Sequence, residues 1–132
     1  MEKKAKILLI DDDVDFVEAT KTILESKPYE VIVAYEGDEG LQKAREENPD
    51  LVLLDIIMPV KDGFTAAEQF KKDPQLNKIP VVMLTSYSSR KGGTSIPVSR
   101  GLELEAEDYV EKPISPEELF NIIEKYLKRA GS

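Results

Sequence analysis

The chain contains no cysteine and no histidine among its 132 residues. Without cysteine it has no disulfides, no thiol chemistry and no sulfur ligand for a metal, which is typical of cytosolic proteins. Without histidine it has no imidazole base, no imidazole metal ligand and no residue that could become phosphohistidine. Carboxylate chemistry remains, and a hard cation such as Mg²⁺ is the metal that carboxylate oxygens prefer.

Positive charge is also scarce. The chain has 18 Lys and Arg residues against 26 Asp and Glu residues, for a formal net charge of -8. A surface of this sign repels nucleic-acid backbones and anionic membranes, so we expect neither direct nucleic-acid binding nor a membrane partner. Apolar runs long enough to span a membrane are absent from the sequence, and we expect a cytoplasmic protein.

The length and the hydrophobic content of 41% suit one domain with a sizeable core. We find no internal repeat, low-complexity tract or linker that would divide the chain. The sequence therefore predicts a single domain over residues 1–132, with a core from about residue 4 to residue 129.

The central feature of the sequence is the apolar run Leu51–Leu54, which is followed directly by Asp55. A short, continuous apolar run is typical of a strand that is buried on both faces of a parallel sheet. Asp55 then lies at the carboxyl end of this strand. Ligands bind at that edge in open α/β sheets, so we expect the functional site there.

Four further strands are predicted, and polar residues follow three of them. Asp11 and Asp12 follow the first strand, Thr85 follows the fourth, and Lys112 follows the last. The carboxyl edge of the sheet should therefore carry acids, a hydroxyl group and a lysine. The four strands cover residues 7–10, 31–34, 81–84 and 108–111.

Helical periodicity occupies the segments between most of these strands. A helix is expected from about 14 to 26, a second begins near Asp38, which can cap it, and a third follows Gly63. The last helix has the clearest start, because Ser115 and Glu118 have the spacing of a capping box. The alternation of strands and helices predicts an α/β fold, a parallel sheet with helices on both faces.

Each polar residue at the strand ends also has a simple structural explanation. The acids after the first strand can cap the next helix, as Asp13 can, and Asp55 can be an ordinary turn residue. Thr85 can satisfy a backbone group, and Lys112 can be a solvated charge. Taken singly, these residues leave both interpretations open. Their common position at one edge of one sheet favours a functional site.

With this arrangement of residues, the chain resembles the receiver domain of two-component response regulators, in particular the single-domain, chemotaxis-regulator-like receivers. The resemblance covers essentially the whole length. It implies a flavodoxin-like, doubly wound, five-stranded parallel sheet in the order 2-1-3-4-5. The matching motif residues are Asp11, Asp12, Asp55, Met58-Pro59, Gly63, Thr85, Tyr109 and Lys112 before Pro113.

The resemblance implies a role for Asp11, Asp12 and Asp55, which form an acidic cluster, and for Ile57 and Lys112. Asp55 corresponds to the phosphoacceptor. Asp12, Asp55 and the backbone carbonyl of Ile57 correspond to direct Mg²⁺ ligands, and Asp11 to a ligand through water. Lys112 corresponds to the cation that neutralises phosphoryl charge.

The resemblance also implies which residues respond to phosphorylation of Asp55 and which affect its dephosphorylation. Thr85 corresponds to the switch hydroxyl and Tyr109 to the rotating aromatic residue. Ile57 and Tyr87 occupy the positions that flank the path of attacking water, and neither offers a carboxylate or amide to orient it. We therefore expect slow autodephosphorylation.

The expected function is to take a phosphoryl group from a sensor histidine kinase or a histidine phosphotransfer protein and to switch a surface that binds an unknown downstream protein. Such a protein is not a conventional enzyme, although it catalyses its own Mg²⁺-dependent phosphorylation.

A phosphorylation-independent docking module is the alternative, but it would be expected to lack one of the motif residues. A hydrolytic phosphatase would need a second acid near Asp55, where the neighbours are Ile56 and Ile57. The acidic loop after the first strand would repel a flavin phosphate.

The segment between Ser86 and Asp108 departs from the family pattern. It is several residues longer than usual, it contains Gly92-Gly93, and Glu105 stands where a helix-ending glycine is usual. The fourth helix should therefore be short, displaced or irregular. An insertion followed by a shortened helix and a wholly irregular segment both fit the sequence, and either predicts an unusual output surface.

Overall fold

The computed structural model of the protein describes residues 5–27, 29–55, 63–86, 108–112 and 114–131. Strands and helices alternate along most of this chain, as the apolar patterns predict. In chain order they are β1 (Ala5–Ile10), α1 (Val14–Glu25), β2 (Tyr29–Ala34), α2 (Gly37–Glu47), β3 (Leu51–Asp55), α3 (Gly63–Lys72), β4 (Val81–Ser86), β5 (Asp108–Lys112) and α6 (Pro116–Gly131).

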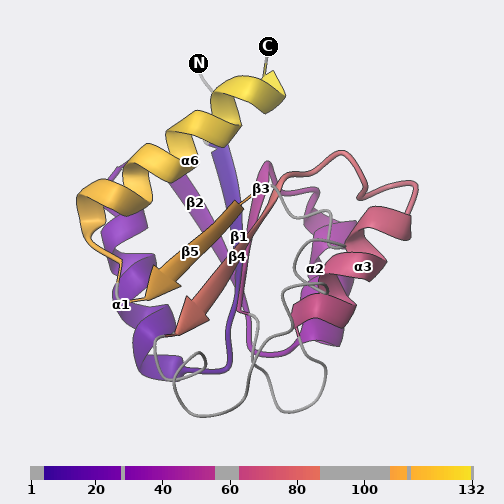
Figure 1. Ribbon diagram of the computed structural model, residues 1–132, viewed down its shortest axis with the longest axis horizontal. Helices are drawn as coiled ribbons and strands as arrows, with labels where there is room; N and C mark the ends of the chain where they lie inside the picture. The colour runs from indigo at the N-terminus through magenta and orange to yellow at the C-terminus, as the bar shows by residue number, and fades with distance from the viewer. Residues whose placement is uncertain (1–4, 28, 56–62, 87–107, 113, 132) are drawn as a thin grey trace.

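The strands form one parallel sheet in the order β2-β1-β3-β4-β5. This order confirms the predicted 2-1-3-4-5 topology and the flavodoxin-like class. Parallel strands need crossover connections, which place helices on the faces of the sheet. Figure 1 shows α1 and α6 over one face and α2 and α3 over the other.

The core consists of two apolar layers, one on each face of the sheet. Side chains of a strand alternate between faces, so Leu8 and Ile10 pack towards α2 and α3, while Ile7 and Leu9 pack towards α1 and α6. All four side chains of Leu51–Leu54 are fully buried, as expected for a central strand. Burying one such side chain contributes about 1.5–3 kcal/mol relative to leaving it exposed.

Two helix starts follow the predicted capping chemistry. Asp13 is the N-cap of α1, and its Oδ1 accepts a hydrogen bond from Phe16 N at 3.1 Å. Ser115 Oγ accepts from Glu118 N at 3.1 Å at the start of α6. Both side chains satisfy an amide that has no partner inside the helix.

The start of α2 differs from the prediction, because its N-cap is Glu36 and not Asp38. The Glu36 side chain accepts a hydrogen bond from Glu39 N at 3.1 Å, and Asp38 lies within the first turn. The helix ends at Glu47, and its C-cap Asn48 has a φ of 50° in the left-handed region and is followed by Pro49. The acid at position 38 therefore contributes to the negative charge of the first turn.

Residues 87–107, on which the predictions for the fourth helix depend, lie outside the described residues. Those predictions stay predictions. Within the described residues, no helix is both long and apolar enough to cross a membrane.

Candidate functional site

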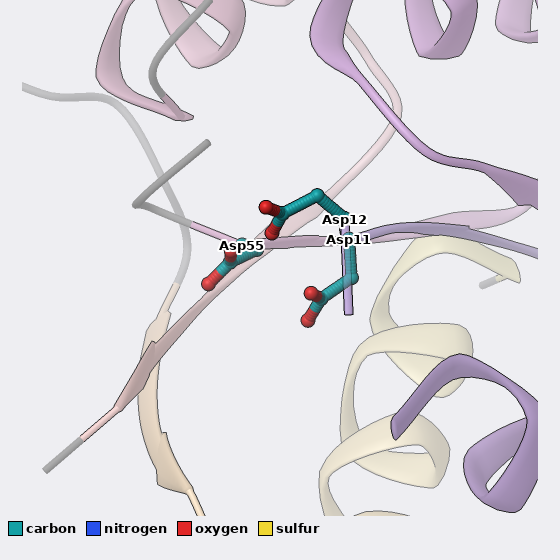
Figure 2. A group of neighbouring side chains, drawn as sticks. All are labelled: Asp11, Asp12 and Asp55. Atoms are coloured by element: carbon teal, nitrogen blue, oxygen red, sulfur yellow. The ribbon is translucent and has the colours of Figure 1, made fainter. Parts of the chain in front are cut away.

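Three carboxylates meet at the carboxyl edge of the sheet. Asp11 and Asp12 directly follow β1, and Asp55 is the last residue of β3. Strands β1 and β3 are neighbours in a register that pairs Ile10 with Leu54, so Asp11 and Asp55 extend side by side from adjacent strands. Figure 2 shows the three side chains gathered there. One oxygen from each lies within 4.8 Å of the others.

The backbone on both sides of Asp11 fixes the position of this residue. Asp11 N donates to Ala34 O at 3.0 Å, which joins it to the end of β2. Asp11 Oδ1 accepts from Asp13 N at 2.9 Å. Because Asp13 also caps α1, the first turn of that helix is tied to the cluster.

The cluster combines like charges with burial. Asp11 is 0% exposed and Asp55 is 5% exposed, whereas Asp12 is exposed. Two unit charges about 4.8 Å apart repel by about 3.5 kcal/mol at an effective dielectric constant of about 20. A folded protein that holds three carboxylates so close is stabilised by any cation that binds among them.

The donor set fits Mg²⁺. All three side chains offer hard oxygen ligands, and Mg²⁺ binds oxygens at about 2.0–2.1 Å in octahedral geometry. Ligand oxygens on such an ion are about 2.9–4.2 Å apart. The carboxylate oxygens, within 4.8 Å of one another, need only small movements to reach that spacing.

The backbone of Thr85 lies next to the cluster, and that of Lys112 lies one strand further along. Asp55 pairs with Leu84 in the adjacent strand β4, so Thr85 follows at the same edge. Lys112 ends β5 and pairs with Ser86. Tyr109 lies three residues earlier in β5 and pairs with Met83. The side chains of Thr85, Tyr109 and Lys112 lie outside the described part of the structure, as do the whole residues Ile57 and Tyr87.

Sequence reasoning missed a network of α2 residues around the end of β2. Glu39 Oε1 accepts from Tyr35 N at 2.8 Å, and Lys43 Nζ donates to Val33 O at 2.6 Å. Glu39 and Lys43 also form an ion pair of 3.3 Å. The backbone hydrogen bond to Tyr35, and then Lys43, hold the pKa of Glu39 below its ordinary value. The spacing of four residues between Glu39 and Lys43 was the feature of the sequence that could have predicted their ion pair.

Comparison with protein-family models matches the response regulator receiver domain over residues 7–124. A probable transcriptional regulator, ycf27 of Guillardia theta, is 38% identical over 131 residues, which cover 99% of this chain and 48% of the relative. The alkaline phosphatase synthesis transcriptional regulatory protein PhoP of Bacillus subtilis is 36% identical over 125 residues, which cover 95% of this chain and 49% of the relative. The chain therefore spans about half the length of these curated relatives.

Solved structures agree with this match. A CheY-like response regulator receiver domain protein from Methanospirillum hungatei JF-1 superimposes with a TM-score of 0.84 and 31% sequence identity. The superposition covers 97% of each chain. The likeness thus extends over the whole sheet and the helices on both of its faces.

Proposed function

The chain belongs to the family of response regulator receiver domains, and from this premise we propose that it accepts a phosphoryl group onto Asp55 in the presence of Mg²⁺. The observation that carries the proposal is the meeting of Asp11, Asp12 and Asp55 at the carboxyl edge of the sheet. The donor would be a phosphohistidine on a sensor histidine kinase or a histidine phosphotransfer protein. We further propose that residues 1–132 form one receiver domain, with a core of about 4–129, and that it works in the cytoplasm.

The cluster would hold Mg²⁺ through Asp12, Asp55 and the backbone carbonyl of Ile57, with Asp11 acting through water. When bound, the ion supplies positive charge that neutralises phosphoryl oxygens and orients the group for transfer. The chain's own contribution is to hold the carboxylates before any substrate arrives. Asp11 is held in this way by the hydrogen bond from its N to Ala34 O and by the one that its Oδ1 accepts from Asp13 N.

Transfer is a displacement at phosphorus. An oxygen of the Asp55 carboxylate forms the new P–O bond while the P–N bond of the phosphohistidine breaks, and the imidazole leaves with the electron pair of that bond. The Lys112 ammonium group would neutralise charge on the phosphoryl oxygens. Because Asp55 ends β3 at the carboxyl edge of the sheet, the donor would approach along that edge.

Thr85 and Tyr109 are suited to pass on the change at Asp55, because their strands β4 and β5 are neighbours. The Thr85 hydroxyl would bind a phosphoryl oxygen, and Tyr109 would turn inward into the space that Thr85 leaves. The result is a population shift between two packings of one fold. The downstream target would be a protein, since the net charge of -8 disfavours direct contact with nucleic acid. The relatives that are named as transcriptional regulators are about twice as long as this chain, so their names describe the longer proteins.

Phosphorylation by acetyl phosphate tests the proposal. The protein with Mg²⁺ should gain the mass of one phosphoryl group, measured by intact-mass spectrometry. Asp55→Ala should gain nothing, and excess chelator should abolish the gain in the wild type. Asp38→Ala, which removes an acid of α2 outside the cluster, should behave as the wild type. An unchanged mass gain in Asp55→Ala, or an equal gain under chelation, contradicts the proposal.

A further inference from the structure

Ala34, the last residue of β2, has a carbonyl that holds the backbone of Asp11. This carbonyl accepts from Asp11 N at 3.0 Å, so it faces β1. Backbone groups of successive strand residues face alternate sides. Val33 O and Tyr35 N, on either side of Ala34, therefore face away from β1. Strand β2 is at the edge of the sheet, and no neighbouring strand among the described residues covers that side.

One ion pair of α2 occupies both of these outward groups. Lys43 Nζ donates to Val33 O at 2.6 Å, and Glu39 Oε1 accepts from Tyr35 N at 2.8 Å. The two side chains are themselves joined, with Glu39 Oε2 at 3.3 Å from Lys43 Nζ. The pair thus takes the place of one residue of a sixth strand. It holds the peptide groups on both sides of Ala34.

The same helix also packs against the residue before Asp11. Gly40 of α2 lies so close to β1 that a Cβ atom there would overlap the side chain of Ile10. Helix α2 is therefore linked to the backbone of Asp11 in two indirect ways. One runs through the side chain of Ile10, and the other runs through the carbonyl of Ala34.

We propose that Glu39 and Lys43 are positioning residues for the acidic cluster, because they fix the carbonyl of Ala34 that orients Asp11. The inference rests on the proposed binding of Mg²⁺ by that cluster. Without the pair, Val33 O and Tyr35 N would turn to water and the end of β2 would loosen. Asp11 would then lose its fixed place beside Asp55.

Because Lys43 is positively charged, the effect of losing its charge on Mg²⁺ binding has the opposite sign to the effect of losing its positioning role. If charge alone matters, removing the cation of Lys43 strengthens the binding of a divalent cation by the acidic cluster. Loss of positioning weakens it. The sign of the change in the Mg²⁺ dissociation constant therefore separates the two causes.

Titration calorimetry with Mg²⁺ at physiological ionic strength provides the test. We expect Lys43→Met to weaken Mg²⁺ binding by roughly 3- to 10-fold, at or below the lower end of the loss typical of residues that orient a metal ligand. Lys43→Arg keeps a donor for Val33 O and should stay close to the wild type. Lys78→Met removes the same charge from an exposed position between α3 and β4, and should leave the affinity unchanged.

Amide hydrogen exchange without Mg²⁺ gives a second readout. In Lys43→Met the amides of Asp11 and Tyr35 should exchange faster, while that of Leu53 in the central strand stays protected. If circular dichroism shows that Lys43→Met is unfolded, Glu39→Ala takes its place. Asp38→Ala is the control with the same charge change, and Glu39→Ala should bind Mg²⁺ more weakly than that control.

Two negative outcomes have different meanings. If the wild type binds Mg²⁺ and Lys43→Met binds it equally or more tightly, the positioning role is wrong. If the wild type itself does not bind Mg²⁺, the proposed function is wrong, and the inference that depends on it is wrong as well.

Discussion

Lys6 and Asp50 exchange two hydrogen bonds. Lys6 N donates to Asp50 Oδ2 at 2.8 Å, and Asp50 N donates to Lys6 O at 2.8 Å. Lys6 Nζ also lies 3.2 Å from Glu47 Oε1 at the end of α2. These contacts join the start of β1 to the turn before β3, at the amino ends of the strands. They set the register of the two strands whose other ends carry the acidic cluster.

Asp50→Ala should lower stability without altering the cluster. The variant loses one hydrogen bond to a backbone amide, and we expect a loss of about 1 kcal/mol in the free energy of unfolding. Urea denaturation measures this loss, and calorimetry should give an unchanged Mg²⁺ affinity. Asp50→Asn keeps an acceptor oxygen and should lose less. A larger loss in Asp50→Asn than in Asp50→Ala would show that the hydrogen bond is not the cause.

The Arg45–Asp73 contact should make stability depend on pH. Arg45 Nε lies 2.8 Å from Asp73 Oδ2, and this hydrogen bond, followed by that from Gln75 N, holds the pKa of Asp73 below its ordinary value of 3.8. A carboxyl group whose pKa is lower in the folded state stabilises the fold above its ordinary pKa. That stabilisation is lost as pH falls through the folded-state pKa.

Arg45→Met should therefore have a lower melting temperature than the wild type at neutral pH, and the gap should close as the pH falls through and below 3.8. The gap should also shrink in high salt, since Arg45 is half exposed. Lys78→Met provides the control for loss of charge. A gap that is as wide in acid as at neutral pH would contradict the assignment.

The apolar runs were sufficient to predict the strands and a parallel sheet, whereas the strand order came from the resemblance to receiver domains. Leu51–Leu54 is apolar at every position, which is typical of a strand buried on both faces, and all four side chains are buried. Strand ends also locate the acids, because Asp11 and Asp55 directly follow apolar runs. The register of Ile10 with Leu54, which decides that their carboxylates meet, depends on packing between distant segments.

Local sequence rules did not predict the N-cap of α2 or the contact of Glu39 and Lys43 with β2, because the tertiary structure determines both. Asp is a better N-cap than Glu, so Asp38 was the natural choice, yet α2 begins two residues earlier and Glu36 caps it. The spacing of Glu39 and Lys43 looks like an ordinary helical ion pair. Its contact with the edge of β2 becomes visible only once the strand order places β2 at the edge.

Ile57 and Tyr87 should make the phosphorylated state long-lived. This prediction depends on the sequence, since both residues lie outside the described residues. Neither side chain can orient water by a carboxylate or amide, whereas Ile57→Asn and Tyr87→Glu introduce such groups. We expect each substitution to speed the decay of the phosphorylated protein several-fold after removal of the donor, as measured by intact mass. Unchanged decay in both variants would exclude the role of these positions.

Mg²⁺ should raise the melting temperature by relieving repulsion within the acidic cluster. At a free concentration of 100 times the dissociation constant, binding to the folded state adds about 2.7 kcal/mol, which corresponds to a rise on the order of 10 °C for a domain of this size. A thermal scan at constant ionic strength measures this rise.

Asp55→Asn provides the sharpest comparison with the wild type. The substitution removes a buried charge from the cluster, so without Mg²⁺ this variant should melt at a higher temperature than the wild type. It should also gain little on adding Mg²⁺, because a ligand is missing. The difference between the two melting temperatures should therefore become smaller as Mg²⁺ is added, or change sign. An equal rise in both proteins would place the ion outside the cluster, and no rise at saturating Mg²⁺ would show that the cluster does not bind it.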